Sequence, residues 1–222
     1  MRLVSVADTH TFEADLGELP AGDVFIHVGD LTRGGELEEM RTVAAWINEQ
    51  PHRHKIIVPG NHDWCFLRER RDVERLLPDV HVLVDERVSI DGVRFWGSPW
   101  QPEFHNWAYN LPRGEALARK WALIPPDTDV LLTHGPPAGY GDTISISTRS
   151  GCADLLDAVR QIRPRLHLFG HIHQDGGLWT EDDLTFANVT TWECERDATV
   201  IDIDAETKAV TAVDVPARER PR

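Results

Sequence analysis

Cysteine is scarce in this chain, and its scarcity excludes two kinds of protein. The 222 residues contain three cysteines, Cys65, Cys152 and Cys194, and no Cys-x-x-Cys pair. An odd number of widely spaced cysteines favours neither a disulfide framework nor a zinc site built from thiolates. We therefore interpret all three side chains as plain thiols.

Long apolar runs and basic tracts are also missing. No stretch approaches the roughly 18 apolar residues that a membrane span requires, and residues 1–6 are typical of a strand rather than of a signal peptide. The formal net charge of −14 disfavours DNA or RNA, which proteins bind through lysine and arginine. We therefore expect a cytoplasmic protein that binds neither a membrane nor long nucleic acid.

What the sequence does contain is an alternation of short apolar runs with amphipathic segments. Runs of valine, isoleucine and leucine without internal proline or glycine predict buried strands at residues 2–7, 24–28, 55–58, 130–133 and 166–169. Residues 37–47 and 155–162 each place their apolar side chains on one helical face. This alternation indicates an α/β protein with a βαβ-type core.

Other parts of the chain have a different character. Short apolar runs separated by turn residues such as Asp91-Gly92 predict strands at residues 82–84, 88–90, 93–96, 199–203 and 209–213. Hairpins of this kind favour a second sheet packed on the first. The length suits one well-buried core, so we predict a single domain over residues 1–222, with residues 217–222 frayed.

Five short motifs follow predicted strands and carry the chemistry. They are Asp8-Thr9-His10, Gly29-Asp30, Gly60-Asn61-His62-Asp63, Thr133-His134-Gly135 and Gly170-His171-Ile172-His173. Ligands of open α/β sheets bind at the carboxyl ends of strands, and glycine lets the chain turn sharply there. We therefore expect the five motifs to meet at one edge of the fold.

The side chains of these motifs are typical metal ligands. Carboxylates and neutral imidazoles without thiolates suit manganese, iron or zinc. The candidate ligands, too many for one tetrahedral ion, are Asp8, His10, Asp30, Asn61, His134, His171 and His173. Two ions about 3.5–4 Å apart can share a bridging carboxylate, hold a phosphoryl oxygen and generate hydroxide from water. The sequence therefore predicts a hydrolase of phosphoesters with two metal ions as cofactors.

In this order the motifs resemble the calcineurin-like metallophosphoesterase family, over a stretch from Arg2 to His173. The resemblance implies a four-layer α/β/β/α sandwich. It also implies one ion held by Asp8, His10, Asp30 and His173, and a second ion held by Asp30, Asn61, His134 and His171. Asp30 would then be the bridging carboxylate.

The same resemblance implies two catalytic residues, His62 and Asp63. His62 would face the substrate and donate a proton to the leaving alkoxide or stabilise the charge on the phosphoryl oxygen, while Asp63 would orient the imidazole. Each residue has an alternative interpretation. His62 would support the metal ligands without touching substrate, and Asp63 would be an ordinary N-cap of a helix that begins at Trp64.

Three further segments, residues 95–102, 104–114 and 132–137, resemble the metallophosphoesterase-domain-containing (MPPED) subgroup. This narrower resemblance implies a phosphodiesterase of small substrates, cyclic nucleotides among them. Aromatic residues in the second segment would either stack on a nucleobase or pack in the core. From this segment we predict His105, Asn106 and Trp107 as substrate contacts.

Our leading hypothesis is a phosphodiesterase in which a hydroxide that bridges the two metal ions attacks phosphorus in line. The partner would be a small phosphorylated substrate. A second hypothesis keeps the site but makes the substrate a phosphomonoester, a phosphoprotein or a dinucleotide polyphosphate. A third is a scaffold that keeps the fold without catalysis, like the retromer subunit of this fold, although the complete ligand set disfavours it.

Two histidines outside the motifs, His27 and His167, alternate with apolar residues inside predicted strands. This placement is typical of core histidines that hydrogen-bond to a neighbour. We therefore exclude both from the predicted metal ligands.

Overall fold

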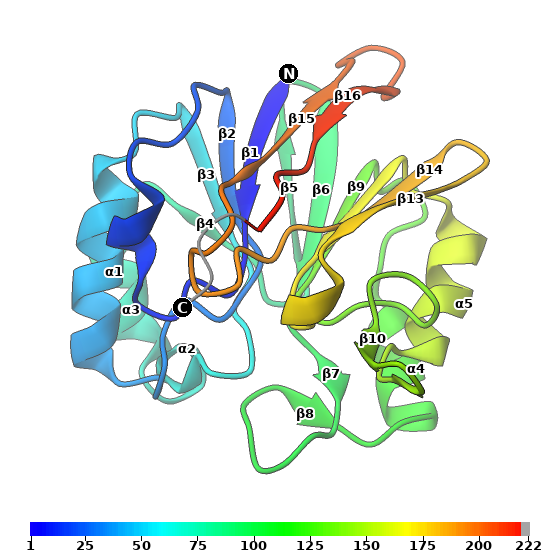
Figure 1. Cartoon of the computed structure of the whole chain (residues 1–222), viewed down its shortest axis with the longest axis horizontal. Coiled ribbons are helices and arrows are strands. Elements are labelled where there is room, and N and C mark those ends of the chain that lie inside the picture. Colours follow the sequence, from blue (N-terminus) through cyan, green and yellow to red (C-terminus); the bar gives the residue numbers. More distant parts are fainter. Residues whose placement is uncertain (219–222) are drawn as a thin grey trace.

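The computed structural model describes residues 1–218 and shows two six-stranded sheets packed face to face (Figure 1). The first sheet contains, in spatial order, β16 (Val210–Asp214), β15 (Thr199–Ile203), β1 (Arg2–Val6), β2 (Val24–His27), β3 (His54–Ile57) and β4 (His81–Val82). The second contains β13 (Gly177–Glu181), β14 (Leu184–Asn188), β12 (Leu166–Phe169), β9 (Val130–Thr133), β6 (Val93–Ser98) and β5 (Glu86–Ile90).

Helices cover the outer faces of both sheets (Figure 1). The first sheet is covered by α1 (Leu37–Glu49), α2 (Trp64–Arg68) and α3 (Arg70–Leu76), and the second by α4 (Glu115–Trp121) and α5 (Ala153–Ile162). The smaller elements are η1 (Glu13–Leu16), η2 (His173–Asp175), β7 (Gln101–Pro102), β8 (Asn110–Leu111), β10 (Thr143–Ser145) and β11 (Thr148–Arg149). The four-layer α/β/β/α prediction is confirmed. Among residues 1–218, no helix is long and apolar enough to span a bilayer.

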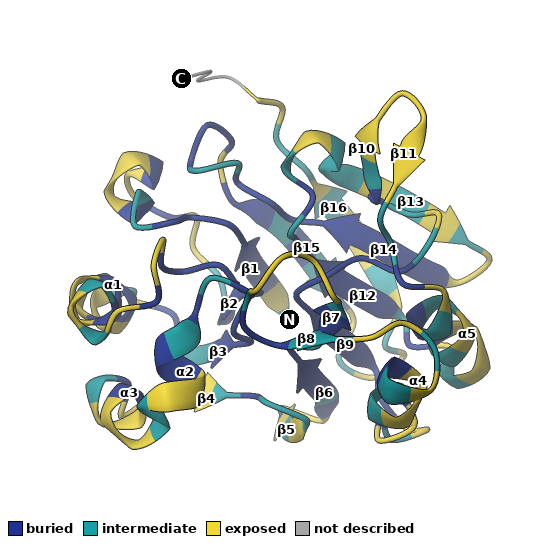
Figure 2. Ribbon diagram, turned by 90° about the horizontal axis from the view of Figure 1, so that it is seen from below, coloured by how far each residue is buried: buried dark blue, intermediate teal, exposed yellow. Residues whose placement is uncertain are grey.

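The sandwich follows from the alternation of side chains along the buried strands. In β2, Val24 and Ile26 lie in the core between the sheets, whereas Phe25 packs toward α1. Leu131 of β9 likewise packs toward α4 and α5. Because successive side chains of a strand point to opposite faces, a strand buried on both faces needs a continuous apolar run. Figure 2 shows the result, with buried strands inside and exposed residues on the outer faces of the helices.

The assignment of strands to sheets differs in part from our prediction. β15 and β16, which we predicted in the second sheet, extend the first, where β15 pairs antiparallel with β1. β9 and β12 lie in the second sheet instead of the first. The hairpin between β5 and β6 is as predicted, and Asp91 and Gly92 both adopt the positive φ that its two-residue turn requires. Local patterns identify strands, but pairing between distant segments depends on tertiary packing.

The parallel strands bring their carboxyl ends to one edge of the molecule. β1, β2 and β3 pair in parallel in the first sheet, as do β6, β9 and β12 in the second. This edge lies at the bottom of Figure 1, where β7 and β8 are found. Our prediction of a single domain stays a prediction, and residues 219–222 of the segment predicted to fray lie outside the described residues.

The two strand histidines are buried and hydrogen-bonded, as predicted. His27 Nε2 lies 3.0 Å from Thr9 Oγ1, and His167 Nε2 lies 2.8 Å from Thr133 Oγ1. Burial lowers the pKa of His167 to about 3, because a charged imidazole inside the sandwich would lose its hydration.

Acid should therefore destabilise the protein in part through His167. The folded-state pKa lies below the unfolded value of about 6.5, so the neutral imidazole contributes stability that is present above pH 6.5 and lost as the pH falls toward 3. Between pH 7.5 and pH 5 we expect the wild type to lose about 2 kcal/mol more free energy of unfolding than His167→Asn. Urea unfolding at both pH values measures this difference, and equal losses in the two proteins would contradict it.

Candidate metal centre

The structure brings the five motifs together at the carboxyl edge of the strands. Three overlapping groups have potential ligand atoms within 4.8 Å of one another, and their members are Asp8, His10 and His173; His10, Asp30 and His62; and Asp30, His134 and His171. The first and third groups correspond to the two ligand sets that the family resemblance implied. The motifs are far apart in sequence, so this convergence is a product of the fold.

Asp30 occupies the middle of the cluster. Its carboxylate is buried, with Oδ2 lying 3.7 Å from His10 Nε2 and Oδ1 lying 3.4 Å from His134 Nε2. Asp30 adopts a positive φ of 56° directly after Gly29, which turns its side chain inward at the end of β2. One carboxylate therefore presents an oxygen to each of the two ligand sets.

Backbone carbonyl groups fix the imidazoles around Asp30. His134 Nδ1 bonds to the Val28 carbonyl at 2.9 Å, and His10 Nδ1 bonds to the Thr32 carbonyl at 3.2 Å. A carbonyl only accepts, so Nδ1 carries the proton and Nε2 of the neutral ring keeps its lone pair. His134 Nε2 also lies 2.9 Å from Oδ1 of Asn61, the amide that we predicted as a ligand. Such partners are typical of metal-binding histidines.

Asp8 joins the first motif to the last. Its carboxylate accepts the His171 backbone N–H at 3.1 and 3.0 Å, and its Oδ1 lies 3.7 Å from His173 Nε2. Asp8, like Asp30, has a positive φ and is buried. The end of β1 is thus held against the loop that follows β12.

The charges of the cluster fit a bound cation. Burial raises the pKa of Asp8, but His173 and His134 lower it by more, so this pKa lies well below its usual value. Burial lowers the pKa of His134, but Asp30 and Asp8 raise it, with a net result of about 9. The buried carboxylates of Asp8 and Asp30 therefore need positive charge beside them. Either a protonated histidine or a metal ion can supply that charge. Oxygen and imidazole donors without thiolates suit manganese, iron or zinc.

Substitution of Gly60 tests how closely the cluster around Asp30 is packed. A Cβ atom at this position would overlap the backbone nitrogen and Oδ1 of Asp30, whereas a Cβ atom on Gly34 would meet nothing closer than Glu39 Oε2 at 3.6 Å. We expect Gly60→Ala to lower manganese affinity by more than about 10-fold, since displaced partners of ligands cost that much, and Gly34→Ala to leave it unchanged. Calorimetric titration checks both variants, and equal affinities would contradict the packing argument.

His62 lies beside the cluster with one ring nitrogen engaged. Its Nδ1 bonds to the Arg33 carbonyl at 2.6 Å, which leaves Nε2 for a substrate. The ring meets His10 edge to face, with centroids 4.7 Å apart, and lies 4.1 Å from the centroid of Trp107. His62 shares a group of potential ligands with His10 and Asp30, although we predicted it only as a catalytic residue.

Asp63 does not hold the His62 ring, contrary to our prediction. Its carboxylate accepts the backbone N–H groups of Gly60, Thr32 and Leu31 at 2.7, 2.9 and 3.3 Å, and the Thr32 hydroxyl at 2.7 Å. Asp63 is the N-cap residue of α2, which begins at Trp64 as the alternative interpretation states, but its side chain makes no capping bond. Asp63 instead ties the loop after β2 to the loop after β3, and so positions the ligands that both loops carry.

The predicted substrate contacts lie in the loop between β7 and β8. His105 and Asn106 are exposed, and Trp107 is half-buried against His62. Phe104, with 47% of its surface exposed, has its ring centroid 6.4 Å from that of His171. This loop therefore forms one side of the centre.

Sequence reasoning missed the backbone groups that orient the site. The carbonyls of Val28, Thr32 and Arg33 fix three imidazoles, yet every residue has a carbonyl and its direction depends on local φ and ψ. The glycine of Gly29-Asp30 was the one available signal, because it marked a sharp turn at this point of the chain.

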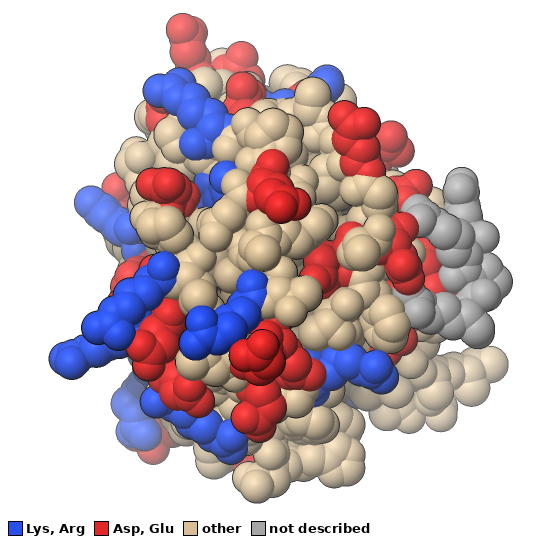
Figure 3. All heavy atoms as spheres, turned by 90° about the vertical axis from the view of Figure 1, so that its left-hand side faces the viewer, with Lys and Arg blue, Asp and Glu red and all other residues tan. Residues whose placement is uncertain are grey.

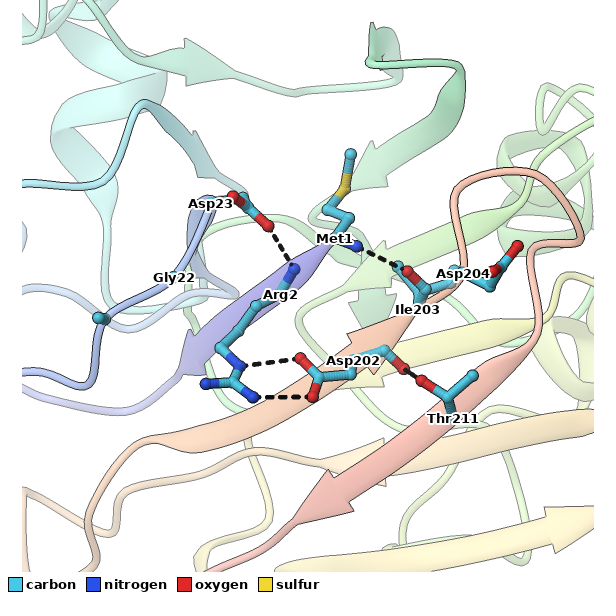
Figure 4. Close-up of a pocket in the computed structure, with 9 residues that line it drawn as sticks. Met1, Arg2, Gly22, Asp23, Asp202, Ile203, Asp204 and Thr211 are labelled. Carbon is cyan, nitrogen blue, oxygen red and sulfur yellow. Dashed lines mark hydrogen bonds and ion pairs between the residues drawn. The ribbon is translucent and has the colours of Figure 1, made fainter.

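A shallow hollow elsewhere on the first sheet has no connection with this centre. Arg2 donates to both carboxylate oxygens of Asp202 at 2.9 Å, and its backbone N–H donates to Asp23 at 2.7 Å (Figure 4). These charged groups already have partners. The hollow lies at the amino end of β1, whereas Asp8 follows its carboxyl end, and we assign it no chemistry.

The sequence is similar to proteins of a known family. A sequence model of the calcineurin-like phosphoesterase family matches residues 1–175. The human metallophosphoesterase domain-containing protein 1 is 39% identical over 214 residues, which cover 85% of this chain and 65% of that protein. This chain thus spans slightly less than two thirds of that relative, and the resemblance to the MPPED subgroup is confirmed.

Solved structures support the fold. A crystal structure from Thermus thermophilus has a TM-score of 0.64 at 16% identity, covering 96% of this chain and 98% of that chain. An archaeal phosphodiesterase has a TM-score of 0.54 at 14% identity, covering 97% and 99%. With the family match spanning most of its length, this chain belongs to the calcineurin-like phosphoesterases, a family of metal-dependent phosphoester hydrolases.

Proposed function

We propose that this protein is a phosphodiesterase that works with two metal ions held at the carboxyl edge of its sheets. The position of the Asp30 carboxylate carries this proposal, because its oxygens lie 3.7 Å from His10 Nε2 and 3.4 Å from His134 Nε2. Asp8 and His173 complete the first ligand set, and Asn61 and His171 complete the second. We propose manganese, iron or zinc as the ions.

In the proposed mechanism the metal ions and the residues of the chain have different roles. When bound, the ions activate water and stabilise the charge on the phosphoryl oxygens. Asp30 holds the two ligand sets at a fixed separation, and the carbonyls of Val28 and Thr32 keep the His134 and His10 imidazoles turned inward. His62, with Nδ1 bonded to the Arg33 carbonyl, uses Nε2 to donate a proton to the leaving oxygen.

We propose small phosphodiesters as substrates, with cyclic nucleotides among them. The centre opens toward an exposed loop that carries Phe104, His105 and Asn106, and aromatic rings near a phosphoesterase centre can stack on a nucleobase. Long nucleic acids fit less well. On the face shown in Figure 3, lysine and arginine are interspersed with aspartate and glutamate rather than gathered in a basic tract.

The substrate class is tested by rates on matched compounds. Apoprotein supplied with manganese, iron or zinc should hydrolyse bis(p-nitrophenyl) phosphate faster than p-nitrophenyl phosphate, and 2′,3′- and 3′,5′-cyclic nucleotides should be compared with both. Faster hydrolysis of the monoester would favour the second hypothesis, a phosphomonoesterase or a dinucleotide polyphosphate hydrolase with the same site. Normal metal binding with no hydrolysis of any phosphoester would favour the scaffold.

We also propose a cytoplasmic location. Cys65 and Cys152 are buried thiols outside any disulfide, which suits a reducing compartment. Fractionation of cells with a compartment marker tests this proposal.

A further inference from the structure

We propose that Trp107 is a positioning residue whose indole ring holds the His62 imidazole toward the metal centre. This inference rests on the proposed function, because it concerns how the proton donor of that reaction is kept in place. It replaces the interpretation of Trp107 as a substrate contact.

The contact itself is close and broad. The ring centroids of His62 and Trp107 lie 4.1 Å apart with an interplanar angle of 30°, so the indole covers one face of the imidazole. On another side the imidazole meets His10 at 4.7 Å and 82°, and its Nδ1 bonds to the Arg33 carbonyl at 2.6 Å. Three contacts therefore restrict rotation of the ring.

The backbone places these two rings opposite each other. The Ala108 N–H donates to the Asn61 carbonyl at 3.0 Å, and these residues are the direct neighbours of Trp107 and His62. The stem of the loop is closed as well, since the Asn110 amide donates to the carbonyls of Phe104 and His105 at 2.9 and 3.2 Å. Trp107 is thus anchored from both sides.

Core packing does not account for Trp107. Its neighbours Ala108 and Tyr109 are buried and belong to the apolar cluster under the first sheet. Trp107 is half-buried and belongs to none of the three apolar clusters formed by the described residues. The indole instead packs against the ring of His62, a residue with a chemical function in the proposed reaction.

A general acid has to be held close to the leaving oxygen, and small misplacement is costly to the rate. Without the indole, the imidazole would keep its bond to Arg33 but lose the surface that limits its tilt. We expect Trp107→Leu to lower kcat about 10-fold, in the range that an aromatic contact and a modest misplacement together produce. KM should change little, and Trp107→Phe, which keeps a flat ring, should retain most of the activity.

The first test measures the contact without using activity. In the proton–nitrogen NMR spectrum of the imidazoles, ring current from the indole should shift the carbon-bound protons of His62 in the wild type. Trp107→Leu should remove this shift and broaden the His62 signals, while Trp46→Leu, a half-buried tryptophan on α1, should leave them unchanged. Identical His62 signals in wild type and Trp107→Leu would overturn the inference.

The second test is a double-mutant cycle with wild type, Trp107→Leu, His62→Gln and the combined variant. Rates on bis(p-nitrophenyl) phosphate and on diphenyl phosphate compare a good and a poor leaving group. If Trp107 acts through His62, its replacement should slow diphenyl phosphate more and should have no further effect in the His62→Gln background. A raised KM together with an effect that persists without His62 would make Trp107 a substrate contact and overturn the inference. If the wild-type protein hydrolyses neither diester, the proposed function is refuted. The NMR test then shows by itself whether the Trp107 indole holds the His62 ring.

Discussion

Replacement of Asp30 by asparagine is expected to abolish metal-dependent hydrolysis. Asparagine keeps the shape of the side chain, so the backbone N–H of His62 keeps an acceptor at Oδ1. The variant loses the negative charge that Asp30 presents to both ligand sets. Loss of an outer hydrogen-bond partner already costs roughly 10- to 100-fold in metal affinity, so loss of the central carboxylate should cost more than about 100-fold. Metal content and diester turnover of apoprotein supplied with manganese measure both effects.

A matched control separates loss of the metal centre from loss of stability. Asp129 is also a buried carboxylate, paired with Arg94 at 2.8 Å, and it directly precedes β9 at the amino end of that strand, whereas the centre lies at the carboxyl ends of the strands. Asp129→Asn should lower the free energy of unfolding while its metal content and turnover stay at the wild-type values. Asp30→Asn with full metal content, or with turnover equal to that of Asp129→Asn, would contradict the role of Asp30.

Replacement of His62 by glutamine should lower turnover while the metal centre stays intact. General acid catalysis contributes about 10²- to 10⁴-fold, so the rate on a diester with a poor leaving group should fall within that range. The loss should be smaller for p-nitrophenyl esters, whose leaving group needs less protonation. Rates on diphenyl and bis(p-nitrophenyl) phosphate, measured with metal content, check this expectation.

The outcome also decides whether His62 is a ligand, because it lies in one group with His10 and Asp30. Full metal content with reduced turnover would identify a proton donor. Loss of one ion would identify a ligand and contradict our assignment. His81→Gln, on an exposed residue of β4, serves as the control and should change neither quantity.

Much of the fold was predictable because both faces of the central strands are buried. Mainly apolar runs such as those of β9 and β12 need no pairing information to be recognised, and their predicted bounds agree with the structure. The pairing of β15 with β1 was not predictable, since the two strands come from opposite ends of the chain. It depends on which edge of the first sheet is left free after β2 and β3 have paired.

The candidate site likewise contains residues that could be predicted from the sequence and contacts that could not. Asp8, Asp30, His134 and His171 could be identified because each follows a strand and the carboxyl ends of parallel strands meet at one edge. The true partners of Asp63 could not be identified, because they are backbone N–H groups of other loops. The type of each side chain can be read from the sequence, whereas the direction in which a backbone N–H or carbonyl group points cannot.

The central claim is that Asp30 joins two metal ions into one centre. The most direct measurement is the electron paramagnetic resonance spectrum of apoprotein titrated with manganese(II), with the bound metal counted in parallel. We predict two ions per chain and a spin-coupled signal that Asp30→Asn converts to that of an isolated ion or removes. One uncoupled ion per chain in the wild type, or a coupled signal that survives in Asp30→Asn, would contradict the account.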